Sequence, residues 1–297
     1  MNDRLRGTVE MTAAMTISGT IGWFVVMSGQ SVQDVVFWRC VFGASTLLVI
    51  CAALGLLRGA LSLRFLALAA LGGAAIVTNW LLLFAAYPRA SISIATAVYN
   101  TQPFMLVGLG ALFFGERLTA AKFAWLSLAF AGVLLIVQSK PGGLSVGSDY
   151  LAGIALALGA AFFYAVAAIV AKKLSGKSPH LIALIQVCVG VLMLAPFANL
   201  STLPHGVAAW SALVTVGVLH TGLMYILLYS AIQRLPTHLT GSLSFIYPLV
   251  AVLVDVIAFG HRLHATEIIG AAAILIAAAG MNLGWSLRWP ALRATNC

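Results

Sequence analysis

The sequence predicts an all-α integral membrane protein built from ten transmembrane helices in two inverted five-helix repeats. Three observations predict this class: a composition of 62% hydrophobic and 8% charged residues, a series of long apolar runs, and an internal repeat. A soluble chain of 297 residues could not bury so much apolar surface. Lipid requires each span to satisfy its own backbone hydrogen bonds, which favours helices.

The apolar runs have the length of membrane-spanning helices. Each is close to the roughly 20 residues that a span requires. Turn-forming residues such as Gly29, Pro141 and Pro204 separate them, and the loops are too short to hold a soluble domain. The ten expected spans, in order, are 8–29, 33–57, 63–87, 91–114, 119–138, 150–172, 178–199, 207–231, 237–259 and 264–285.

The internal repeat aligns residues 79–118 with residues 224–263 without gaps. The ten identical positions include the pairs Pro103/Pro248 and Arg117/Arg262, which an apolar composition does not explain. Five spans per copy turn the second copy upside down in the membrane, an arrangement typical of secondary transporters. We therefore expect a first repeat at 1–140, an inverted second repeat at 148–286 and a tail at 287–297.

The net charge is +9, and the positions of the basic residues indicate how the chain is oriented in the membrane. With the N-terminus in the cytoplasm, twelve basic residues fall on the inside, and Arg89, Lys140 and Arg262 fall outside. This bias predicts that both termini, and the tail, are cytoplasmic. The sequence contains no basic groove, so we expect no nucleic-acid partner. The inside set is Arg4, Arg6, Arg58, Arg64, Arg117, Lys122, Lys172, Lys173, Lys177, Arg234, Arg288 and Arg293.

A transport site is expected near the bilayer midplane, where broken helices of the two repeats meet. Pro103 and Pro248 lie near the middle of the fourth and ninth spans, and each should kink its helix. We expect them to act as hinges in gating, although a kink that only improves packing is the alternative. Asn79, Tyr99 and Gln102 lie at a similar depth, where a polar group needs another helix or a ligand as partner.

Further cavity candidates come from the spans of the second repeat. Phe163 and Tyr164 lie near the middle of the sixth span, and Tyr247 precedes the second proline. With the other rings they predict an apolar pocket with few polar groups. His220, in the middle of the eighth span, is either an interhelical hydrogen-bonding residue or a site residue that carries a coupling proton.

Arg39 and Asp255 are the charges that lie farthest into spans. Both are expected toward the outer ends of their helices, within snorkelling distance of the interface. A structural or gating role is favoured over substrate contact, with Asp34 as a partner for Arg39.

Enzyme and metal functions find no support. The sequence contains no HExxH motif, no P-loop and no nucleophile elbow, so we expect no enzyme. His261 and His264 have the spacing of metal ligands but no third ligand in view, and Cys40, Cys51 and Cys188 are read as free thiols. The fourth cysteine, Cys297, is read as a free thiol as well. No metal and no cofactor are expected.

Together, the spans, the repeats, Phe-Trp-Arg at 37–39 and Phe-Gly-Glu-Arg-Leu-Thr at 114–119 resemble the EamA branch of the drug/metabolite transporter superfamily. The resemblance covers residues 8–285, and within the branch the chain is similar to YddG-like aromatic amino acid exporters. His261 replaces Glu116 in the second copy, so a shared role for that position is doubtful. The resemblance implies a cavity lined by the first, third, fourth, sixth, eighth and ninth spans, in a bacterial inner (plasma) membrane.

The expected function is export of a small-molecule substrate across the lipid bilayer by alternating access, with amino acids, aromatic or otherwise apolar, as leading substrates. Export of drugs, organic cations, sugars or nucleotide derivatives is the alternative within the superfamily. A membrane scaffold without transport is the alternative from a different class. Proton coupling as against uniport stays open, and we expect a monomer or a weak homo-oligomer.

Overall fold

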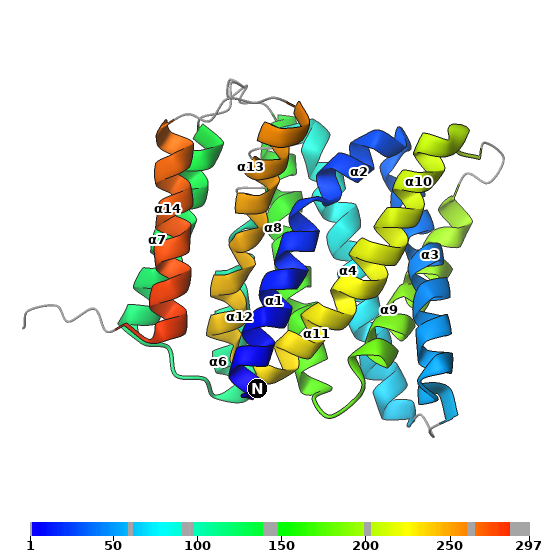
Figure 1. Cartoon of the computed structure of the whole chain (residues 1–297), viewed down its shortest axis with the longest axis horizontal. Coiled ribbons are helices and arrows are strands. Elements are labelled where there is room, and N and C mark those ends of the chain that lie inside the picture. The colour runs from blue at the N-terminus through cyan, green and yellow to red at the C-terminus, as the bar shows by residue number, and fades with distance from the viewer. Residues whose placement is uncertain are drawn as a thin grey trace, which may run out of the picture.

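A computed structural model describes residues 2–58, 62–90, 95, 98–138, 148–198, 203–259 and 265–285. All regular secondary structure in these residues is helical (Figure 1). Seven helices are long and apolar enough to cross a membrane, and three shorter apolar helices accompany them. These ten elements match the ten predicted spans in order, which confirms the all-α membrane fold.

The first five spans correspond to six α-helices. They are α1 (Asp3–Gly19) with α2 (Ile21–Ser28), α3 (Val32–Ala53), α4 (Leu63–Ala90), α6 (Gln102–Phe114) and α7 (Ala120–Gln138), with a 3₁₀ turn, η1 (Leu56–Arg58), after α3.

The second five spans contain more interruptions. They are α8 (Ser148–Lys173), α9 (Pro179–Leu194) with the 3₁₀ turn η2 (Ala195–Phe197), α10 (Gly206–Gly217) with the π-helical η3 (Val218–Leu223) and α11 (Met224–Arg234), α12 (Thr237–Ser244) with α13 (Ile246–Phe259), and α14 (Ala265–Leu283).

Four spans are interrupted near their middle, and two of the breaks involve the repeated prolines. Pro103 is the second residue of α6, after a turn at Asn100 and Thr101, and Pro248 is the third residue of α13, after the break at Phe245. The sequence predicted a kink inside a continuous helix, whereas each proline instead lies in the first turn of a new helix. The physical reason is that the first N–H groups of a helix have no intrahelical acceptor, so a proline there forfeits little.

Helix packing joins the two repeats in pairs. α3 packs on α9, α6 on α12, α7 on α14, α4 on α8 and α1 on α11 (Figure 1). Numbered by span, these pairs are 2–7, 4–9, 5–10, 3–6 and 1–8. If each span is replaced by its counterpart in the other repeat, the same five pairs result. The ion pair of Asp3 with Arg234 places the start of α1 beside the end of α11. A hydrogen bond from Gln233 to the Leu174 carbonyl places the end of α8 at the same end of the bundle. α1 and its counterpart α8 therefore run in opposite directions, as inverted repeats require.

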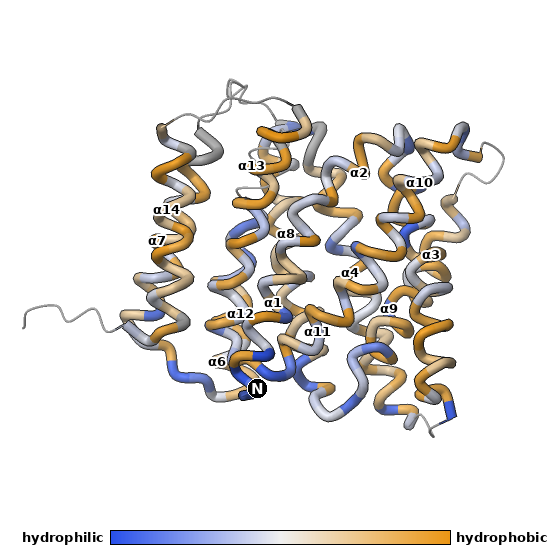
Figure 2. The backbone as a smooth tube through the Cα atoms, viewed as in Figure 1, coloured by the Kyte–Doolittle hydropathy of each residue, from blue (hydrophilic) through white to orange (hydrophobic). Residues whose placement is uncertain are grey.

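The distribution of side chains is that of a protein in lipid. Large apolar residues such as Leu112, Leu192 and Ile257 are more than 70% exposed, whereas Arg39 and Gln186 are buried. In water such an apolar exterior would drive association. Figure 2 shows hydrophilic residues gathered at the N-terminal end of the bundle, the end that holds the N-terminus.

Candidate functional site

Asn79 on α4 is the polar centre of a buried cluster between the repeats. Its side chain is 1% exposed, and Nδ2 donates hydrogen bonds to Tyr99 Oη at 3.3 Å and to the Ala160 carbonyl of α8 at 2.7 Å. A buried amide in a membrane protein needs such partners, because lipid offers none. Asn79 thus ties the third, fourth and sixth spans together.

Tyrosines from four spans lie around Tyr99, the hydrogen-bond partner of this amide. The rings of Tyr99 and Tyr164 meet edge to face, with centroids 6.3 Å apart. Tyr99 also lies within electrostatic range of Tyr225 and Tyr247. The structure therefore brings together Asn79, Tyr99 and Tyr164, three residues that the sequence had proposed as cavity residues, with Tyr247 in electrostatic range of Tyr99.

Arg39 lies in the interior, contrary to the expectation that it reaches an outer interface. Its exposed fraction is 2%. Cζ lies 3.9 Å from the centroid of the Trp80 ring, and Nε donates a hydrogen bond to Thr221 Oγ1 at 3.2 Å. Among the described residues no carboxylate forms a salt bridge with Arg39, and Asp34 accepts a hydrogen bond from Ser31 at the start of α3. Depth along a helix does not say which face a residue occupies, and this face points inward.

The cluster continues through Tyr225 and Tyr229, two rings that were not among the sequence candidates. The Trp80 ring lies 5.8 Å from that of Tyr225, which lies 5.3 Å from that of Tyr229. Tyr229 Oη donates a hydrogen bond to Gln186 Oε1 on α9. Two tyrosines four residues apart, and a glutamine inside an apolar run, were the available signals.

Two buried amides in this region have an atom without a hydrogen-bond partner. They are Gln102 Oε1 and Gln186 Nε2, in side chains that are 4% and 1% exposed. Leaving such an atom unpaired costs about 1–3 kcal/mol, and it requires an explanation in a native structure. A polar ligand would supply the missing partner.

His220 belongs to the junction of the broken first and eighth spans. It is fully buried on η3, with Nε2 2.8 Å from Thr20 Oγ1 and Nδ1 3.3 Å from the Thr215 carbonyl. Because a carbonyl can only accept, Nδ1 carries the proton of a neutral His220, and Nε2 accepts from Thr20 Oγ1 when that hydroxyl turns away from the Ile17 carbonyl, which lies 2.8 Å from it. This geometry is that of an interhelical hydrogen bond between α10–α11 and the α1–α2 break.

The remaining sequence candidates occupy the edges of the cluster. Phe163 is half-buried against the core, with its ring 5.7 Å from that of the exposed Phe162. Pro103 packs on Gly241, where a Cβ would lie 3.3 Å from the proline Cβ, so α6 and α12 cross closely. Pro248 is buried in α13.

Glu116 organises the N-terminal end of the bundle. Its carboxylate accepts hydrogen bonds from Lys172 Nζ at 2.9 Å, from the Thr237 backbone N–H at 3.0 Å and from Thr237 Oγ1 at 2.6 Å. It therefore caps the first turn of α12, where a negative charge is favourable. Burial alone raises the pKa of Glu116, but His238, whose Nδ1 lies 3.7 Å away, and hydrogen bonds from Thr237 and Lys172 outweigh it and hold the pKa well below its ordinary value.

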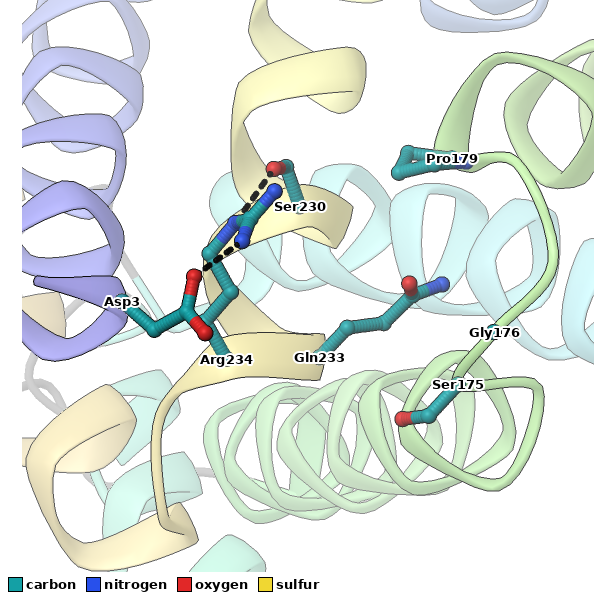
Figure 3. Close-up of a pocket in the computed structure, with 7 residues that line it drawn as sticks. All are labelled: Asp3, Ser175, Gly176, Pro179, Ser230, Gln233 and Arg234. Atoms are coloured by element: carbon teal, nitrogen blue, oxygen red, sulfur yellow. Dashed lines mark hydrogen bonds and ion pairs between the residues drawn. The ribbon is translucent and has the colours of Figure 1, made fainter.

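A second group of ion pairs joins α1 to α11 at the same end. Arg234 Nη1 lies 2.7 Å from Asp3 Oδ1, Arg234 Nε lies 3.4 Å from Glu10 Oε2, and Ser230 Oγ donates to Glu10 at 2.6 Å. Asp3, Ser230 and Arg234 border a polar cavity of about 370 Å³ (Figure 3). It is lined by Asp3, Ser175, Gly176, Pro179, Ser230, Gln233 and Arg234.

No group of three or more metal-ligating side chains occurs in the part of the chain that the structure describes. His261 and His264, the pair with metal-ligand spacing, lie outside the described residues, as do Arg262 and the side chain of Asp255.

Comparison with protein families gives two matches along the chain. The model of the EamA-like transporter family matches residues 7–138 and again residues 151–283. A solved crystal structure superposes with a TM-score of 0.81 over 93% of this chain and 96% of that chain, at 21% identity. That likeness concerns the fold alone.

Several bacterial transporters are similar in sequence. An uncharacterized transporter, YxxF, of Bacillus subtilis is 28% identical over 277 residues, which cover 93% of this chain and 88% of that protein. A "Probable amino-acid metabolite efflux pump" of Escherichia coli is 28% identical over 66% of this chain and 68% of its own length. The threonine/homoserine exporter RhtA of Escherichia coli is 28% identical over 65% of this chain and 63% of its own length.

Proposed function

The chain belongs to the EamA-like transporter family of the drug/metabolite transporter superfamily, and from this membership we propose that it exports small metabolites, chiefly amino acids, through the centre of the bundle. Two similar bacterial proteins carry names that describe amino-acid efflux or threonine/homoserine export. Ring-bearing side chains in the centre favour amino acids with an aromatic or apolar side chain.

The buried cluster between the repeats is the observation that carries this proposal. Asn79 and Tyr99 supply hydrogen-bonding groups, Tyr164 supplies a ring, and Gln102 holds an unpaired carbonyl oxygen. A transporter site is expected at the midplane between inverted repeats, where helices are broken. Phe163 and Tyr247 would extend the apolar wall as the cavity opens.

Alternating access follows from the breaks and from the charged contacts at the N-terminal end. There Glu116 joins α8 to α12, and Arg234 joins α11 to α1. Their ion pairs hold this end closed, so it opens only when they separate. The turns before Pro103 and Pro248 give α6 and α13 freedom to tilt.

The N-terminal end faces the cytoplasm in this proposal, and the protein lies in a bacterial inner membrane. Basic residues such as Arg6, Lys172, Lys177 and Arg234 gather at that end, as the positive-inside bias requires (Figure 2). The two repeats span 1–140 and 148–286 in this proposal, with residues 287–297 as a cytoplasmic tail. Whether the protein acts as a monomer or as a weak homo-oligomer is decided by cross-linking in the membrane.

Export of organic cations is less well supported than export of amino acids. A cation site usually holds a carboxylate at mid-depth, and the buried polar residues in the described part of the chain include no Asp or Glu. Sugars and nucleotide derivatives are tested by the same substrate panel. Proton coupling through His220 is compatible with its depth, while its hydrogen bonds suit a structural link.

Efflux of labelled amino acids from vesicles that contain the purified protein tests the proposal. We expect efflux of amino acids with apolar side chains above that of protein-free vesicles. Tyr99→Ala and Gln102→Ala should each lower this efflux at normal expression, whereas Phe162→Ala, at an exposed position, serves as the matched control. A protein that moves no member of a broad panel would be a scaffold.

A further inference from the structure

Arg39 is a buried cation whose hydrogen-bonding capacity is mostly unused. A guanidinium has five N–H donors, and the described residues engage it through Nε, which donates to Thr221 Oγ1. Trp80 covers one face of the group at 3.9 Å. The hydrogen bonds and salt bridges of the described residues include none to Nη1 or Nη2.

Burial makes this arrangement costly unless an anion completes it. A buried charge is normally paired, because the lost hydration must be replaced. The aromatic face of Trp80 offsets part of that loss. Arg39 begins the third turn of α3, about 10 Å from the helix start at 1.5 Å per residue, which is within the apolar region.

The surroundings of Arg39 are those of the proposed substrate cluster. Trp80 follows Asn79 on α4 and contacts the ring of Tyr225. Both Tyr225 and Tyr99 lie within electrostatic range of the guanidinium. The two terminal nitrogens of arginine form a planar fork that matches both oxygens of a carboxylate.

We infer that Arg39 is a substrate-binding residue whose Nη1 and Nη2 groups bind the carboxylate of the transported molecule. This inference rests on the proposed function and sharpens it. Trp80 and the tyrosines contact the apolar part of the substrate, while Thr221 holds the guanidinium in place through Nε. The substrate class is therefore small carboxylates, which includes amino acids and excludes amines that lack a carboxylate.

The experiment compares molecules that differ only in the acid group. Vesicles with the reconstituted protein are loaded with labelled phenylalanine, phenylalaninamide or phenethylamine, and a parallel series uses leucine and leucinamide. Wild-type protein is expected to export each acid at least tenfold faster than its amide. In detergent, the acid is also expected to raise the thermal midpoint of the wild-type protein, and the amide is not.

Variants of Arg39 assign this discrimination to one residue. Arg39→Gln should lower export of the acid roughly 10- to 100-fold, the loss typical of a hydrogen bond to a charged group, and should bring the acid-to-amide ratio close to one. Arg39→Lys keeps the charge but loses the fork, so its ratio should be intermediate. Arg89→Gln is the matched control, because Arg89 is exposed and donates to the Ala85 carbonyl of its own helix.

The outcomes separate this inference from the function on which it rests. A wild-type protein that moves no molecule of the panel overturns both. A wild-type protein that moves acid and amide equally, or is stabilised equally by them, overturns the carboxylate assignment alone. If Arg39→Gln does not fold, Arg39→Lys with an unchanged acid-to-amide ratio overturns it in the same way.

Discussion

Replacing Glu116 with glutamine tests how the N-terminal end is held closed. Glutamine keeps the size of the side chain but removes its charge. Its amide nitrogen would face Lys172 Nζ or the Thr237 N–H, where a donor meets a donor. The side chain is only 17% exposed, so water replaces these partners poorly. A lost helix cap costs about 1 kcal/mol, and a lost hydrogen bond to a charged group costs about 1.5–3 kcal/mol. Because these contacts overlap, we expect a loss of about 2–3 kcal/mol.

The pH dependence of this loss identifies the carboxylate as its source. The pKa of Glu116 is lowered in the folded protein, whereas an unfolded glutamate titrates near about 4.3. The stability that the carboxylate contributes is therefore fully present above about pH 4.3 and is lost as pH falls through the lower folded pKa. The difference between the wild-type protein and Glu116→Gln should be full at pH 7 and should shrink as the pH falls below about 4.

Thermal unfolding in detergent, followed by tryptophan fluorescence, measures the effect. At pH 7 the thermal midpoint should fall by about 4–12 °C, at 2–4 °C per kcal/mol. Asp149→Asn is the control, since it removes an exposed carboxylate from the first turn of α8 and should change stability by less than about 0.5 kcal/mol. A Glu116→Gln effect as small as that of the control, or one that stays constant from pH 7 to pH 3, would refute the reasoning.

Three further predictions concern packing and the proposed site. At Gly110 a Cβ would overlap Thr237 Oγ1, so Gly110→Val should prevent the close crossing of α6 and α12 and lower the folded yield. Gly108→Val, with nothing within 4 Å, should be tolerated. Equal yields, measured by size-exclusion chromatography, would contradict this. Asn79→Leu removes two hydrogen bonds worth about 1–2 kcal/mol together and should reduce amino acid efflux from vesicles, and unchanged efflux removes Asn79 from the site. His220→Gln can keep the bond to Thr20 but cannot carry a proton, so efflux should no longer depend on a proton gradient if His220 couples it; persistent dependence assigns the proton to another group.

Part of the candidate site was predictable because polar side chains at mid-span are anomalous in lipid. Asn79, Tyr99 and Tyr164 stood out on that ground, and the structure brings them together. Arg39 was misplaced, because its distance from the end of α3 suggested an interface, while the side chain points into the bundle. Neither distance along a helix nor composition fixes which face of a span meets its neighbours.

The contacts of Glu116 also could not be predicted from the sequence. The motif that contains it indicated a family, yet nothing in the motif named its partners. Lys172 and Thr237 lie 56 and 121 residues away in the chain. Such a contact exists only after the fourth, sixth and ninth spans have packed together.

The sequence by itself determined the ten spans, the duplication and its inversion. These follow from the length of apolar runs, from turn residues and from the odd number of spans per copy, which are local or countable properties of the chain. Only the tertiary structure decided that Pro103 and Pro248 begin helices, that Arg39 is buried on Trp80 and that Glu116 caps α12. Each of these depends on the facing surfaces of separate helices, which become fixed only when the two repeats pack against each other.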